Sequence, residues 1–252
     1  MRDLAGTATL NLAACPQGGS VSSAGVEFFF DPVCPFCWVT SHWVRNVAGQ
    51  RPLDIVWRPL SLRILNEPIG YEGKPARYPD AHQRGLEMLR VVTAARTAHG
   101  RAILGDLYTA MGEAVWNAPP PDEDGFEAVL NATAEPRDLD AILDRVRLPR
   151  ELADAAADDS WDSEIRAETE EAVQRAGGGV GTPILSFDPP DGPAFFGPVI
   201  DEAPEGEEAL RMWDAVRTLA DRPGFAELKR NLRAFPDTPL SSRIAHRGTQ
   251  VG

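Results

Sequence analysis

The sequence is poor in cysteine and in basic residues, and it has no long apolar stretch. Three cysteines among 252 residues allow one disulfide with one thiol left over, unlike a small secreted protein held together by disulfides. No apolar run approaches the roughly 20 residues that a membrane span needs. Acidic residues outnumber basic ones by 38 to 25, which disfavours nucleic acid and anionic membranes as partners. We therefore expect a globular protein of a reducing cytoplasm.

A metal-binding pattern is also missing. The chain has one C-x-x-C, at Cys34 and Cys37, and four histidines that are scattered along the sequence. Zinc needs two ligands beyond such a pair, so we expect no metal, although half a zinc site remains one alternative interpretation. A purely structural disulfide is another, but a bridge between residues three apart closes too short a loop to stabilise a fold much.

The cysteine pair lies where an expected strand passes into an expected helix. Residues 26–30 are apolar or aromatic except for Glu27, and they are followed by Asp31-Pro32, as is typical of a buried strand that ends in a turn. Pro35 is tolerated in a first helical turn, where the amide it lacks would have no partner. Apolar residues four apart then continue the helix to Gly49.

This position predicts different tasks for the two cysteines. Cys34 sits at the helix N-terminus, where free backbone amides and the helix dipole favour the thiolate that attacks disulfides and electrophiles. Cys37 follows one turn later on the same face, close enough to form a disulfide with little backbone movement. We predict that Cys34 is the nucleophile and that Cys37 resolves the mixed disulfide.

The rest of the chain predicts a sheet interrupted by helices. A second strand is expected at residues 54–58, whereas residues 61–67 have no firm assignment. From about residue 78 to 176 apolar residues recur with helical spacing, and this stretch is too long for a simple crossover. We expect a helical subdomain at residues 76–176, inserted into a sheet domain formed by residues 26–75 and 177–235.

The second part of the sheet domain and the two ends of the chain complete the prediction. Residues 182–187 and 194–199 are expected to form a hairpin, followed by an amphipathic helix around residues 209–220. Residues 1–25 are expected to be a disordered extension and residues 236–252 a flexible tail. The extension contains Cys15, to which the sequence assigns no role.

Several separated blocks of sequence carry a family resemblance. They span residues 26–235 and are FDPVCPFCWVTSHW, SLRILNE, AHG, LYTAMG, GTP, AFFGPV, GEEALRMWDA and FAELKR. Together they resemble the DsbA-type thioredoxin-fold proteins of actinobacteria and, within them, the mycothiol-dependent nitroreductase family. The resemblance implies an α/β fold, thioredoxin-like and of DsbA type, with a large inserted α-helical subdomain. It also implies mycothiol as the reducing cosubstrate, with no tightly bound cofactor.

The same resemblance suggests residues that surround the cysteines. In thioredoxin-like folds a cis proline faces the cysteine pair, and Thr182-Pro183 is placed correctly for it, although a trans turn proline is the alternative. Pro35 and Phe36 lie between the cysteines, and Trp38 is expected to flank the site. Asn66 resembles a polar residue that lines the pocket, and an Asx-type turn or helix cap is the alternative interpretation of Asn66. All six are predicted substrate-binding residues.

Phe36 is a departure, because the family usually has Trp there. Phe keeps an aromatic face, but it lacks the indole donor and is smaller. The range of flat nitroaromatic substrates that the family resemblance implies is therefore an open question for this chain. Strongly oxidising DsbA proteins carry His in this dipeptide, where it stabilises the thiolate. With Phe36 in its place, we expect a more reducing pair.

The function expected from these observations is a cytoplasmic thiol-disulfide oxidoreductase, a mycothiol-dependent reductase that acts on a small disulfide or electrophile and extends to nitro compounds. Two alternatives stay open at this point: an oxidase or isomerase of protein disulfides of DsbA type, and a redox-gated binding protein. The sequence also leaves open whether the chain forms a homodimer through its helical part.

Overall fold

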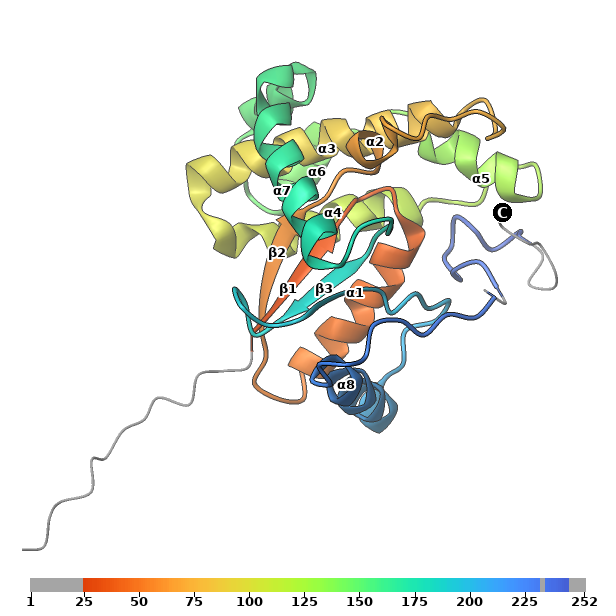
Figure 1. Cartoon of the computed structure of the whole chain (residues 1–252). Helices are drawn as coiled ribbons and strands as arrows, with labels where there is room; N and C mark the ends of the chain where they lie inside the picture. Colours follow the sequence, from red (N-terminus) through yellow and green to blue (C-terminus); the bar gives the residue numbers. More distant parts are fainter. Residues whose placement is uncertain (1–24, 232–233, 245–252) are drawn as a thin grey trace, which may run out of the picture.

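A computed structural model of the chain describes residues 25–231 and 234–244. Residues 1–24, with Cys15 and nearly all of the expected N-terminal extension, lie outside the described residues. So do residues 245–252 of the expected tail. Figure 1 shows a central sheet with helices on both of its faces.

The sheet has the strand order β2-β1-β3-β4. The strands are β1 (Gly25–Phe30), β2 (Asp54–Pro59), β3 (Ile184–Phe187) and β4 (Ala194–Phe196). β1 pairs in parallel with β2 and antiparallel with β3, so that Phe28 lies between Trp57 and Leu185. With α1 (Pro35–Ala48) joining β1 to β2 and a β3-β4 hairpin followed by α8 (Gly206–Ala220), this is a thioredoxin-like fold of DsbA type.

The three consecutive phenylalanines of β1 are explained by burial on both faces of the sheet. Side chains alternate along a strand, and Phe28 and Phe30 accordingly enter the main hydrophobic core. Phe29 points to the opposite face, where it packs with Ala172 and Ile184.

Helix α1 (Pro35–Ala48) begins at the cysteine pair and ends at Gly49, as predicted. It packs against α8 (Gly206–Ala220), which was also predicted. The Trp43 indole donates to the Ala209 carbonyl over 3.0 Å, and the Trp43 and Trp213 rings are 5.5 Å apart. These contacts hold the helix that begins at the cysteines against the first half of α8.

The chain between β2 and β3 is helical, in agreement with the predicted periodicity. Its α-helices are α2 (Leu62–Asn66), α3 (Tyr78–His99), α4 (Leu104–Trp116), α5 (Phe126–Thr133), α6 (Leu139–Arg145) and α7 (Asp162–Arg175). Its 3-10 helices are η1 (Arg101–Ile103), η2 (Arg150–Ala157) and η3 (Asp159–Trp161). Residues from α3, α4 and α6 share one hydrophobic core with β1 and α1. The inserted subdomain proposed at residues 76–176 thus shares its hydrophobic core with the sheet.

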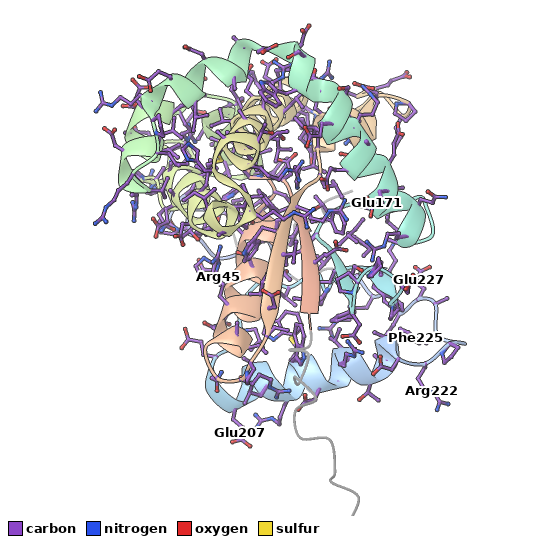
Figure 2. The ribbon with its side chains drawn as sticks, turned by 90° about the vertical axis from the view of Figure 1, so that its left-hand side faces the viewer. Arg45, Glu171, Glu207, Arg222, Phe225 and Glu227 are labelled. Atoms are coloured by element: carbon purple, nitrogen blue, oxygen red, sulfur yellow. The ribbon has the colours of Figure 1, made fainter. Side chains whose placement is uncertain are left out.

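Helix α4 approaches the sheet closely at Gly105. A Cβ at Gly105 would overlap the Trp57 side chain of β2. The Gly105 carbonyl accepts a hydrogen bond from the Arg45 guanidinium over 2.9 Å, and Arg45 also lies 4.2 Å above the Trp57 ring. Figure 2 labels this arginine on α1, on the side that faces α4.

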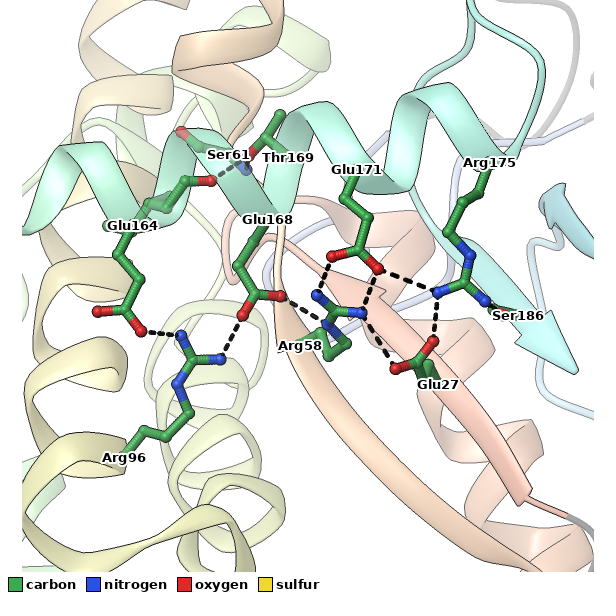
Figure 3. A network of polar contacts seen from close by, with 11 residues as sticks. Glu27, Arg58, Ser61, Arg96, Glu164, Glu168, Thr169, Glu171, Arg175 and Ser186 are labelled. Atoms are coloured by element: carbon green, nitrogen blue, oxygen red, sulfur yellow. Dashed lines mark hydrogen bonds and ion pairs between the residues drawn. The ribbon is translucent and has the colours of Figure 1, made fainter. Parts of the chain in front are cut away.

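Charged residues fix α7 to the opposite face of the sheet, as Figure 3 shows. Arg58 of β2 contacts Glu27 at 3.0 Å, Glu168 at 2.6 Å and Glu171 at 2.6 Å. Glu168 also contacts Arg96 of α3 at 2.6 Å. Because buried charges are costly unless they are paired, this network favours one placement of α7 relative to β1, β2 and α3.

The described part of the C-terminal tail differs from our prediction. Residues 236–252 were expected to be flexible, but residues 236–244 pack on the protein: Leu240 is 1% exposed and Ile244 is 5% exposed. The Leu240 amide donates to the Trp116 carbonyl at the end of α4 over 3.1 Å. The physical reason is that two apolar side chains gain more by covering the core than this short segment loses by becoming ordered.

Candidate functional site

The two cysteines lie at the N-terminus of α1, beside the start of β3. Both are free thiols. Cys34 is the N-cap residue of α1, and its sulfur accepts a hydrogen bond from the Cys37 amide over 3.4 Å. The Cys34 thiol donates to the Thr182 carbonyl over 3.6 Å. The helix start thus directs Cys34 toward the loop before β3.

Thr182 faces both sulfurs. Its hydroxyl lies 2.9 Å from the Cys37 sulfur, and the Thr182-Pro183 peptide bond is cis, as the predicted placement requires. The Pro183 carbonyl accepts a hydrogen bond from the Gly197 amide over 2.8 Å, which fixes this loop to the end of β4. Sequence reasoning therefore located the loop opposite the cysteines correctly, while the binding of substrate by Thr182 and Pro183 stays a prediction.

The environment makes Cys37 a weak acid. Burial raises the pKa of the Cys37 thiol well above its ordinary value, and the hydrogen bond and charge of Cys34 raise it further. Hydrogen bonds from the Thr182 hydroxyl and the Asp31 backbone lower the Cys37 pKa, but they do not outweigh burial. Cys37 has no exposed surface, and Cys34 is 5% exposed. A protonated, enclosed Cys37 suits a residue that reacts second.

Asp31 is a buried acid that sequence reasoning did not assign to the site. Its carboxylate accepts hydrogen bonds from the Val33 amide at 3.0 Å and the Leu62 amide at 2.8 Å. Burial raises the pKa of Asp31 to about 7, and these two hydrogen bonds offset part of the increase. A Cβ at Gly85 of α3 would overlap the carboxylate. Asp31 therefore connects the loop before Cys34 to α2 and α3.

Four half-buried aromatic side chains extend from the dipeptide between the cysteines. The Phe36 ring is 6.0 Å from that of Phe235, which is 5.9 Å from that of Phe126. The Phe126 ring is 6.2 Å from that of Tyr78, and all four side chains keep part of their surface exposed. Burial, and next the charge of Cys34, raises the pKa of Tyr78. We call these four residues the aromatic wall.

Trp38 does not take the place that we predicted. It is 4% exposed, and its ring meets the Tyr108 ring edge-on at 6.2 Å. A Cβ at Gly112 of α4 would overlap the Trp38 ring, so this indole fills the interface between α1 and α4. Its substrate-binding role is therefore corrected to a packing role, because the face of α1 that carries it turns toward α4.

Asn66 lies at the C-terminal end of α2. Its side-chain amide donates to the Leu62 carbonyl one turn earlier, over 2.8 Å. This contact favours the local structural interpretation, and a role in lining the pocket stays a prediction.

Two further polar side chains that sequence reasoning missed lie on α3 and the segment before it. The Tyr71 hydroxyl lies 3.0 Å from His82 Nδ1. Burial, with a smaller effect from the charge of Arg63, lowers the pKa of His82 to about 4. His82 is therefore neutral at physiological pH. Scattered histidines gave no sequence signal for this pairing.

Two searches of residues 25–231 and 234–244 bear on cofactors and membranes. In this part of the chain, no three His, Cys, Asp or Glu side chains come together in a group that could hold a metal ion. Within the same residues, no helix is both long enough and apolar enough to cross a membrane.

Comparison with known proteins gives consistent matches. The family model described as Rv2466c-like, mycothiol-dependent nitroreductase Rv2466c, matches residues 33–230. The uncharacterized protein Rv2286c of Mycobacterium tuberculosis is 31% identical over 206 residues, which cover 81% of each chain.

Among solved structures, a probable DsbA oxidoreductase of Streptomyces coelicolor is similar, with a TM-score of 0.45 and 16% identity over 85% of this chain and 97% of that chain. The cytosolic disulfide reductase DsbM of Pseudomonas aeruginosa has a TM-score of 0.45 and 17% identity over 77% of this chain and 99% of that chain.

Proposed function

Because the chain belongs to the Rv2466c-like family of mycothiol-dependent nitroreductases and is a thiol-disulfide oxidoreductase, we propose that it is a mycothiol-dependent reductase that acts through Cys34 and Cys37. The observation that carries this proposal is the arrangement of the pair. The Cys37 amide donates to the Cys34 sulfur over 3.4 Å, and Cys37 itself is fully enclosed. Of the two sulfur-bearing residues, only Cys34 keeps any exposed surface, 5%, which supports Cys34 as the residue that meets the substrate first.

The first half-reaction uses the Cys34 thiolate. It attacks one sulfur of a small disulfide, a bond forms between that sulfur and Cys34, and the other sulfur leaves as a thiolate that takes up a proton. The helix N-terminus supports the anionic sulfur through backbone amides. The Thr182 carbonyl, 3.6 Å from the Cys34 sulfur, marks the side on which the adduct would lie.

The second half-reaction uses Cys37. After it loses its proton, its sulfur attacks Cys34, the mixed disulfide breaks, and the second thiol of the substrate is released. The substrate has then gained two electrons and two protons, and Cys34 and Cys37 are joined in a disulfide. With a nitro compound as substrate, the same two electrons and two protons yield a nitroso group and water.

The oxidised pair must be reduced again. Two molecules of mycothiol supply the two electrons: one forms a mixed disulfide with Cys34, and the second releases it as mycothiol disulfide and restores both thiols. The family's description supports mycothiol as the donor. A reducing cytoplasm is the compartment that this chemistry requires, and we propose it as the location.

The proposal is tested by offering the oxidised protein mycothiol, glutathione and thioredoxin in parallel and following the return of two thiols per chain. Mycothiol should be the competent donor. Equal reduction by glutathione, or reduction by thioredoxin alone, would contradict mycothiol dependence. Absence of any thiol-disulfide exchange at Cys34 would contradict the reductase itself.

A further inference from the structure

The C-terminal segment, residues 234–244, reaches the cysteine site although it lies beyond the residues that the family model matches, 33–230. In Figure 1 this segment, in blue, runs beside the upper end of α1 toward α5. Its ring contact to the site is made by Phe235, 6.0 Å from Phe36. The segment therefore adds a side chain next to the dipeptide between the cysteines that the matched part of the chain does not contain.

The placement of Phe235 depends on its own ring contact and on the residues that follow it. Its ring meets Phe126 of α5 edge-on at 5.9 Å. Five residues later, the buried Leu240 amide donates to the Trp116 carbonyl over 3.1 Å. The Trp116 indole in turn donates to the Pro32 carbonyl over 3.0 Å, in the loop before Cys34. The C-terminal segment and the cysteine loop are thus attached to the same residue of α4.

The aromatic wall differs from the aromatic residues of the core. Phe28, Phe29 and Phe30 have no exposed surface, whereas Phe36, Tyr78, Phe126 and Phe235 each keep part of theirs. Exposed ring faces beside a reactive sulfur can stack on a planar group of a substrate, and each aromatic pair adds to the affinity beyond the area that it buries. An aliphatic substrate gains no such contact.

We propose that Phe235 is a specificity-determining residue that makes the site prefer substrates with a flat aromatic ring next to the reacting group. This inference rests on the proposed function, because it assumes that Cys34 is the nucleophile. Our sequence analysis placed Phe235 at the end of the predicted sheet domain, directly before the expected flexible tail, and gave it no function. Phe235, at the start of the C-terminal segment, completes an aromatic surface that Phe36 begins.

The experiment compares two disulfides, the aromatic 5,5'-dithiobis(2-nitrobenzoic acid) and the aliphatic bis(2-hydroxyethyl) disulfide. The kcat/KM ratio of the first to the second is measured for the reduced full-length protein and for Phe235→Ala and Phe235→Leu. Leu keeps apolar volume but removes the ring. The ratio is unaffected by the fraction of folded protein, so a loss of stability in either variant does not obscure the result.

Phe225→Ala is the matched control. Phe225 also follows α8 and is half-buried, and its ring contacts Phe195 of β4 at 5.9 Å. Figure 2 labels it just beyond the end of α8. Removing its ring tests for a general effect of losing an aromatic contact after α8.

We expect the ratio to fall about fivefold in both Phe235 variants, the loss of one aromatic pair, and to stay unchanged in Phe225→Ala. An unchanged ratio in the Phe235 variants, or equal acceleration of both disulfides, would overturn the inference while leaving the reductase intact. If the unmodified protein reduces neither disulfide through Cys34, it is the proposed function that fails.

Discussion

The Cys37 sulfur lies 2.9 Å from the hydroxyl of Thr182, across the gap between α1 and the loop that precedes β3. The contact joins the cysteine that is proposed to react second to a residue whose backbone carbonyl accepts a hydrogen bond from the other cysteine, Cys34. Burial raises the pKa of Cys37, whereas the hydrogen bond with the Thr182 hydroxyl is one of the interactions that lower it. We therefore expect the Thr182 hydroxyl to affect the rate of the second step.

Replacing Thr182 with Val tests that relationship. Without the hydroxyl the pKa of Cys37 should rise further, so resolution of the mixed disulfide should become roughly fivefold slower at neutral pH, the effect of about 1 kcal/mol for one hydrogen bond. The pH at which resolution reaches half its maximum should move upward. Stopped-flow release of the second thiol measures both quantities.

Thr182→Ser provides the control, because it keeps the hydroxyl and loses only a methyl group. It should restore the pH profile of the unmodified protein. If Val and Ser behave alike, the hydroxyl has no part in activating Cys37.

Asp31 gives a prediction about stability and pH. The pKa of Asp31 is about 7 in the folded protein, whereas an exposed aspartate, as in the unfolded chain, has a pKa of 3.8. The folded state therefore binds the proton more tightly than the unfolded chain. The contribution of Asp31 is then most favourable below about pH 4, is lost as the pH rises to about 7, and stays constant above that. By linkage the loss is at most about 4 kcal/mol.

Asp31→Asn, which cannot ionise, isolates this effect. The free energy of unfolding of the unmodified protein minus that of the variant, from urea titrations, should decrease between pH 5 and pH 8. A difference that stays flat over this range would show that the Asp31 carboxyl is not protonated preferentially in the folded state.

Phe36→His tests why the pair is expected to be reducing. A histidine next to Cys37 and two residues after Cys34 can stabilise the thiolate, and hence the reduced form, as Phe36 cannot. The reduction potential, measured by equilibration with a glutathione buffer, should rise by about 30 mV or more, a tenfold change in the equilibrium constant.

Phe36→Trp is the companion variant, because it has the residue that the family usually carries. Its potential should stay close to that of the unmodified protein, since indole carries no charge. A similar increase in both variants would assign the effect to packing against Phe235 and not to charge.

Local sequence predicted the part of the site that consecutive residues form. The strand, the turn at Asp31-Pro32 and the helix from Pro35 to Ala48 depend on a short stretch of chain, and its pattern is complete within that stretch. The hairpin at residues 182–187 and 194–199 was likewise predicted from two strand-like runs on either side of a turn. The placement of Thr182-Pro183 opposite the cysteines came from the resemblance to thioredoxin-like folds and not from local sequence.

The features that sequence reasoning missed all depend on distant partners. Its position beside Cys37 predicts Trp38 as a site residue, and only the absence of a Cβ at Gly112 of α4 explains how the indole fits in the core. Leu240 lies in a segment too short and too polar to show a period, and its burial depends on the end of α4 at Trp116. The carboxyl group of Asp31 and the rings of the aromatic wall likewise contact residues that the chain brings together only on folding, so their local sequence gave no signal of these contacts.

The central claim is that Cys34 attacks first and Cys37 second. It is tested most directly by Cys37→Ser in a Cys15→Ser background, in which the reduced protein is mixed with a small disulfide and analysed by intact mass and peptide mapping. We expect one stable mixed disulfide per chain, on Cys34, and no release of the second thiol. The Cys34→Ser protein in the same background should form no adduct at a comparable rate. An adduct on Cys37 in that protein, formed as fast as the one on Cys34, would contradict the account.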